Sequence, residues 1–113
     1  MARDPRHALE DMHAAIVGIE EAARGKTLEE FERDWLLRHG IQRGIEIISE
    51  ASRALPDEVR ERHPEIPWER IRAVGNVLRH EYHGVSNALI WRVVIDELPR
   101  LRRAIEAIRG RYP

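Results

Sequence analysis

The stretch PWERIRAVGNVLRHEYHG, residues Pro67 to Gly84, contains the clearest periodic pattern in the chain. Proline favours the first turn of a helix, and glycine favours the position just after its end. Apolar side chains recur between these two residues at three- and four-residue spacing: Trp68, Ile71, Val74, Leu78 and Tyr82. This spacing predicts an amphipathic helix over residues 67–83 that packs along one face.

The same helix carries polar side chains on a second face. Because successive helical residues are about 100° apart, five polar positions fall on one side: Arg72, Asn76, Arg79, His80 and His83. A solvated outer face is the simplest explanation of such a set. Two histidines, an amide and two guanidinium groups within about three turns also suit a catalytic or binding site.

Two helices are predicted before this stretch. The first begins at Asp4-Pro5, with a capping residue followed by proline, and ends at Gly25. In the second, Thr27 and Glu30 form a capping box, and an apolar stripe continues as far as Leu55. Residues 56–67 contain three prolines, and they predict a connection with a short helical turn near residues 57–62.

A fourth helix is predicted after Gly84. Ser86 is its capping residue, and Pro99 lies inside it and should kink it. The sequence therefore predicts one all-α domain over residues 1–113, an antiparallel four-helix bundle with a short extra turn. The predicted core is Leu9, Met12, Ile16, Ile19, Phe31, Ile41, Ile45, Ile48, Ile71, Leu78, Ile90, Val94, Leu98, Leu101 and Ile105.

Composition sets the broad class. The chain has 113 residues, of which 42% are hydrophobic and 35% charged, which suits one helical domain with charged outer faces. It has no cysteine, so disulfides and thiolate chemistry are excluded. Its start is charged and no apolar run reaches membrane-spanning length, so we expect a cytoplasmic protein.

Charge is distributed unevenly along the chain. Residues 1–66 contain 10 Lys/Arg and 15 Asp/Glu, whereas residues 67–113 contain 9 Arg and 5 acidic residues. The guanidinium group matches phosphate geometry, so the basic half is compatible with a nucleic-acid substrate. The net charge of −1 argues against a broad nonspecific footprint, and any polyanion would bind locally.

Two common site types do not fit the polar face. His80 and His83 could share a metal ion, but the third and fourth ligands of a usual site are missing from the sequence pattern. None of the three serines lies in a nucleophile-elbow context, which argues against a Ser/His/Asp hydrolase. We therefore expect neither a metal nor a cofactor.

The segment GNVLRHEYHGVSNALIW, residues 75–91, resembles the signature of HepT-like proteins of the HEPN superfamily. Members are small all-helical bacterial ribonucleases, often toxins paired with a minimal nucleotidyltransferase antitoxin. Their signature is Arg-Asn, three variable residues, His, one variable residue and Tyr, followed by a helix with an Ile-x-Trp-like start. Asn76, His80, Tyr82 and Trp91 match it, and RGIEIISEASRALP, residues 43–56, resembles the family's upstream segment. The resemblance extends over nearly the whole chain.

The resemblance implies a metal-independent endoribonuclease that cleaves RNA by attack of the ribose 2′-OH. His80 would be the acid or base, Asn76 would orient it or contact phosphate, and a homodimer would bring two copies of His80 into one cleft. It also implies that Tyr82 receives AMP from a partner nucleotidyltransferase, which silences the toxin. His83 is a supporting candidate.

One position departs from the family signature: Gly75 stands where the family has its catalytic arginine. Arg79, which we favour, or Arg72 could supply the guanidinium instead. The alternative is a catalytically inactive module of the same superfamily that binds a nucleotidyltransferase or RNA. A third possibility is a helical interaction protein whose polar face is a dimer contact.

Overall fold

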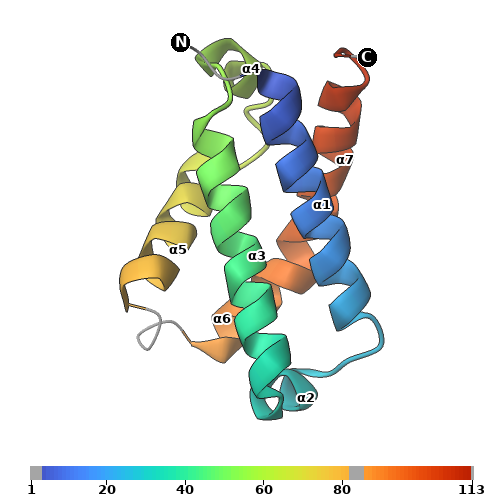
Figure 1. The fold of residues 1–113 in the computed structure, drawn as a ribbon, viewed down its shortest axis with the longest axis vertical. Coiled ribbons are helices and arrows are strands. Elements are labelled where there is room, and N and C mark those ends of the chain that lie inside the picture. Colours follow the sequence, from blue (N-terminus) through green and yellow to red (C-terminus); the bar gives the residue numbers. More distant parts are fainter. Residues whose placement is uncertain (1–3, 82–85, 113) are drawn as a thin grey trace.

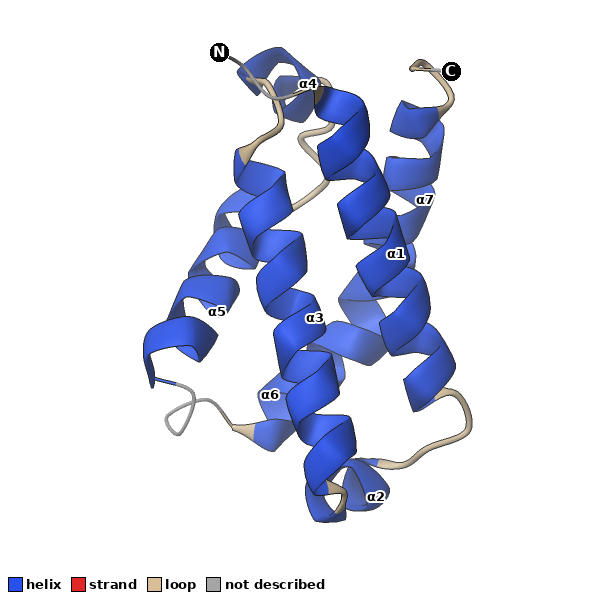
Figure 2. Cartoon of the chain, viewed as in Figure 1, coloured by secondary structure: helices blue, strands red, loops and turns tan. Residues whose placement is uncertain are grey.

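The computed structural model describes residues 4–81 and 86–112, which form helices and short connections (Figures 1 and 2). No strand occurs in these two ranges. The helices are α1 (Pro5–Ala23), α2 (Leu28–Arg33), α3 (Trp35–Arg53), α4 (Asp57–Glu61), α5 (Trp68–Glu81), α6 (Asn87–Arg92), the π-helical turn η2 (Val93–Glu97) and α7 (Leu98–Arg109). The predicted all-α class is confirmed, and α4 is the predicted extra turn.

Helix α3 is the central element of the bundle. It packs along α1 on one side and along α5 on the other, while α7 packs against α1 (Figure 1). Ordered by their strongest contacts, the long helices therefore follow one another in space as α5, α3, α1 and α7. Helix α5, which carries the polar face, depends mainly on α3 for its position.

Four helix starts, those of α1, α2, α3 and α6, are capped by local side chains. The Asp4 carboxylate accepts a hydrogen bond of 2.9 Å from the Arg6 backbone N–H at the start of α1. The predicted capping box is present, since Glu30 N–H donates to Thr27 Oγ1 (3.1 Å) and Thr27 N–H donates to Glu30 Oε1 (3.0 Å). Ser86 Oγ likewise accepts from the N–H of Leu89, at 3.0 Å. These predicted caps are confirmed.

The prediction of one helix from Thr27 to Leu55 is wrong. The chain leaves the helical conformation at Asp34, which has φ −97° and ψ 101°. Its carboxylate accepts a hydrogen bond of 2.9 Å from the N–H of Leu37, so Asp34 caps a new helix. This break separates α2 from α3, and the sequence pattern hid it because apolar residues, Phe31 and Leu37, lie on both sides of it.

The fourth predicted helix is interrupted close to the predicted place. Proline has no N–H, so Pro99 cannot donate to a carbonyl of the preceding turn. The chain forms the π-helical turn η2 just before it, where Leu98 N–H donates to the carbonyl of Val93. The segment therefore divides into α6, η2 and α7.

The core lies where the sequence predicts it. Fourteen of the fifteen predicted residues are buried, and Ile71 on α5 is half-buried instead. The largest fully buried side chains include Phe31 of α2, whose ring packs against Trp91 of α6 with centroids 5.1 Å apart. In the described residues, no helix is long and apolar enough to cross a membrane.

Candidate active site on helix α5

Helix α5 is anchored at its beginning by Trp68. The indole ring is only 8% exposed, and its Nε1–H donates to the carbonyls of His63 (3.0 Å) and Arg60 (3.2 Å). These carbonyls belong to the end of α4 and the connection that follows it. The start of α5 is therefore held against α4 and the connection after it.

The middle of α5 makes its closest approach to α3 at Gly75. This glycine is buried, and a Cβ placed on it would overlap Cβ and Oγ of Ser49. Ser49 Oγ donates to the carbonyl of Arg72 at 3.3 Å, and Ser52 Oγ donates to the carbonyl of Ser49 at 2.7 Å. Position 75, where the family has arginine, is thus closed by the helix contact.

The two described polar-face side chains lie on the outer part of α5. Asn76 is exposed, and the half-buried Arg72 pairs with Glu69 of the same helix at 3.0 Å. Arg72 is therefore already paired with a carboxylate one turn towards the start of the helix. It lies two turns from position 80, roughly 12 Å along the axis.

Two further predicted site residues, Arg79 and His80, lie at the end of the helix. The backbones of Arg79 and His80 form the last turn of α5, so positions 76 and 80 are one turn apart, about 6 Å along the axis. Tyr82 and His83 lie outside the described residues. The helix thus places Asn76, Arg79 and His80 close together along its axis.

Ser49, the residue of α3 that packs against Gly75, was not identified from the sequence. The serine lies in the run Ser49, Glu50, Ala51, Ser52 of α3. The side chains of this run are small except for that of the glutamate. A small-residue run on one helix and an interior glycine on the next together indicate close packing of two helices. That combination is the signal that predicts the contact.

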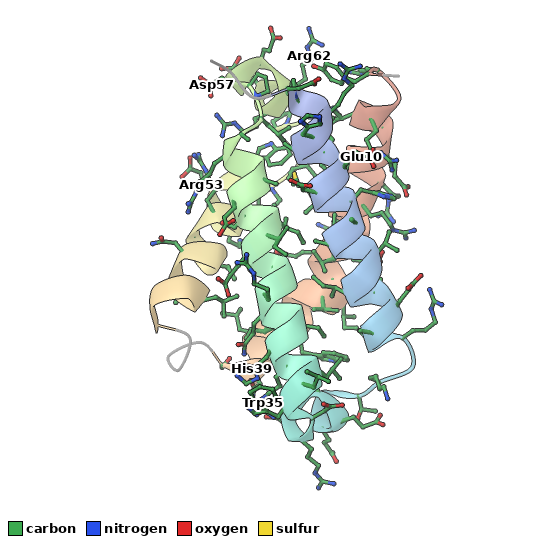
Figure 3. All side chains as sticks on the ribbon, viewed as in Figure 1. Glu10, Trp35, His39, Arg53, Asp57 and Arg62 are labelled. Carbon is green, nitrogen blue, oxygen red and sulfur yellow. The ribbon has the colours of Figure 1, made fainter. Side chains whose placement is uncertain are left out.

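An exposed aromatic pair at the start of α3 was also missed. Trp35 is 63% exposed, and its ring stacks on His39 at a centroid distance of 4.2 Å (Figure 3). His39 Nδ1 lies 2.7 Å from the carbonyl oxygen of Trp35, which fixes the imidazole beside the indole. The position of Trp35 in the apolar pattern indicated neither burial nor a site, so this pair could not be predicted.

Metal ligation would require several donor side chains in one place. Among the described side chains there is no cluster of three or more His, Asp or Glu residues that could hold an ion. The described part of the polar face offers an amide and a guanidinium group, Asn76 and Arg72, and these are groups that bind phosphate oxygens.

Comparison with known proteins gives consistent matches over the chain. Residues 12–108 match the family model described as "Ribonuclease HepT-like". The chain is 36% identical over 109 residues to "Probable ribonuclease HepT" of Thermococcus cleftensis, covering 96% of this chain and 99% of the relative. It is 35% identical over 106 residues to "Putative RNase TTE0752" of Caldanaerobacter subterraneus subsp. tengcongensis, covering 94% and 95%.

No solved structure matches the chain significantly. The family model covers the helices α3 and α5 that form the site, and the two relatives match almost from end to end. The expected resemblance is confirmed: the chain belongs to the ribonuclease HepT-like family of the HEPN superfamily.

Proposed function

We propose that this chain is a metal-independent endoribonuclease whose active site lies at the end of α5. The family match and the relatives named as ribonucleases support the reaction class. The observation that carries the proposal is that α5 continues unbroken through Asn76 and His80, one turn apart, as the signature requires. His80 acts as acid or base, and Asn76 orients it or binds a phosphate oxygen.

The reaction needs three groups around one phosphate. A base removes the proton of the ribose 2′-OH, which attacks the adjacent phosphorus, and an acid protonates the departing 5′-oxygen. The products are a 2′,3′-cyclic phosphate and a free 5′-OH. A cation stabilises the charge that develops on the phosphorane oxygens, and Arg79 is the favoured candidate for it, because Arg72 already pairs with Glu69.

One chain offers one His80, whereas the reaction uses a base and an acid. A homodimer with α5 near its two-fold axis would supply two copies of the imidazole to a shared cleft. Helix α5 is suited to such a contact because its strongest packing is on one side only, against α3. We therefore propose a homodimer as the active form.

Regulation of this site is proposed from the match to the family. In this proposal the protein is the toxin of a toxin–antitoxin pair, and a minimal nucleotidyltransferase adds AMP to Tyr82. An added phosphate group two residues along the chain from His80 would repel RNA phosphate by charge and by bulk. Mass spectrometry after co-expression with such an enzyme should find AMP on Tyr82, and AMP found on another residue would refute this assignment.

A second candidate function follows from Gly75. Residue 75 is glycine, so the guanidinium of the family signature is absent there, and a Cβ at this position would overlap Ser49 of α3. This favours, as the alternative, an inactive module that binds RNA or a nucleotidyltransferase through the same face.

Cleavage of a defined RNA oligonucleotide in the presence of EDTA tests the proposal. The purified protein should cut it and leave 2′,3′-cyclic phosphate ends. A matched oligonucleotide with a single 2′-deoxy sugar at the cut position should resist cleavage there, because the nucleophile is missing. Binding of RNA without cleavage would support the inactive module, and cleavage of the deoxy-substituted position would contradict 2′-OH attack.

A further inference from the structure

The bundle leaves a seam between α5 and the C-terminal segment. Helix α5 packs along α3, but within the described residues it has no comparable contact with η2 or α7. The seam is bridged instead by an ion pair between Arg70 of α5 and Glu97 of η2. Arg70 and Glu97 also line a cavity that lies in this seam.

A cavity of about 180 Å³ lies in this seam. Aliphatic side chains from four elements line it: Ile45 and Ile48 of α3, Ile71 and Val74 of α5, Val93 of η2 and Leu101 of α7. An apolar cavity of about 150 Å³ stays dry and takes up benzene. The seam cavity is therefore large enough for a benzene-sized apolar group.

The charged groups lining the cavity are two carboxylates, Glu65 and Glu97, and two guanidinium groups, Arg70 and Arg100, and not all of them are paired with one another. Arg70 pairs with Glu97, and the Glu65 carboxylate pairs with His63 at 3.0 Å. The hydrogen bond from His63 lowers the pKa of Glu65, so this carboxylate stays charged and occupied. Arg100 also lines the cavity and is exposed, and no carboxylate in the described part of the chain pairs with it. One guanidinium group is left over beside an apolar space.

We propose that the seam cavity binds a small monocarboxylate with a benzene-sized apolar body. The apolar body would fill the space between α3, α5 and η2, and the carboxylate would meet Arg100. A guanidinium group without a paired carboxylate favours an acidic ligand, because the two form charge-assisted hydrogen bonds. The turn η2 at the wall supports a binding role, since π-helical turns occur frequently at functional sites. This site is separate from the polar face of α5 and does not depend on RNA cleavage.

A titration with 3-phenylpropanoate, followed by NMR of the isoleucine methyl groups, tests the proposal. The methyl signals of Ile45, Ile48 and Ile71 should shift saturably, with a dissociation constant on the order of 0.1 mM for a ligand of this size. The alcohol 3-phenylpropan-1-ol, which has the same body without the charge, should bind about tenfold more weakly. Acetate, which has the charge without the body, should not shift these signals.

Two substitutions separate the apolar and charged parts of the site. Ile71→Phe should fill the cavity and abolish binding, whereas Ala107→Phe, at an exposed position of α7 outside the cavity lining, should not. Arg100→Gln, at an exposed position that leaves the fold intact, should reduce binding of the acid to that of the alcohol, and Arg103→Gln on the same helix should have no effect.

The proposal is overturned if the acid produces no saturable shift, or if acid and alcohol bind equally to the unaltered protein. It is also overturned if the same methyl signals shift with protein concentration and not with ligand, because a second copy of the chain would then cover the seam.

Discussion

At the scale of single residues, Gly75 matters both for the packing of α5 against α3 and for the chemistry of the candidate site. Replacing it with alanine places a methyl group against Ser49, so α3 and α5 must separate. Overpacking of this kind costs about 1–3 kcal/mol of unfolding free energy. Gly40 is the matched control, since nothing lies within 4 Å of its Cβ position, and Gly40→Ala should stabilise the protein by about 0.5–1 kcal/mol. Urea denaturation of both variants measures the difference, and equal effects would contradict the close contact.

The close contact between Gly75 and Ser49 also affects the variant Gly75→Arg. Gly75→Arg would restore the guanidinium of the family signature, but its Cβ would overlap Cβ and Oγ of Ser49 on α3. We expect Gly75→Arg to destabilise the protein more than Gly75→Ala does. A Gly75→Arg variant with unchanged stability would show that α5 can move away from Ser49 at little cost.

Glu106 provides a pH-dependent link between α7 and α1. A hydrogen bond from His13, with a separation of 3.0 Å, lowers the pKa of this carboxyl below its usual 4.5. A carboxyl with a lowered pKa stabilises the fold above its unfolded-state pKa, and this contribution is lost as the pH falls through the lowered value. The stability difference between wild type and Glu106→Gln should therefore shrink below about pH 4.5 in thermal denaturation. A constant difference at all pH values would contradict it.

At the scale of elements, Asp34 determines where α3 begins. Removing its carboxylate leaves the N–H of Leu37 without its capping partner. Asp34→Ala should cost about 0.5–2 kcal/mol, as losses of helix caps do. Glu21→Ala, at an exposed position inside α1, is the control and should change stability by less than about 0.5 kcal/mol. Chemical denaturation distinguishes the two, and a neutral Asp34→Ala would mean that tertiary packing alone sets the boundary.

The sequence predicted the helices well and their internal breaks less well. Apolar spacing identified the faces of α1, α3, α5 and α7, because burial on one side imposes that period on any helix. The break at Asp34 was missed because apolar residues lie on both sides of it, Phe31 before and Leu37 after, and neither glycine nor proline marks it. Ile71 was misassigned because periodicity identifies a face but not whether a neighbouring helix covers it, and here the seam leaves it half-buried.

The residues of the candidate site on α5 could be predicted from the sequence, whereas their contacts with other helices could not. Asn76 and His80 follow from the signature and lie on one helix as expected. The closure of position 75 by Ser49 was not predictable from the signature, because it depends on the distance between two helices far apart in sequence. The aromatic pair of Trp35 and His39 was equally out of reach, since exposure is decided by the whole bundle.

At the scale of the whole molecule, the proposed active site requires two chains. Sedimentation at micromolar concentration should give a dimer. Val77→Glu places a charge at an exposed apolar position of α5, which is 38% exposed in the single chain, and should shift the equilibrium to monomer. Ala107→Glu, at an exposed position of α7, is the control and should leave the dimer intact. A monomeric wild-type protein would contradict the shared cleft.

The most direct test of metal-independent RNA cleavage by this chain is the cleavage rate of His80→Ala in EDTA. The account predicts a rate about 10²–10⁴-fold below wild type, because the general acid or base is lost. His7→Ala, at an exposed position near the start of α1, should cleave at the wild-type rate. Cleavage by His80→Ala at the wild-type rate, in a protein with unchanged helical content, would contradict the central claim.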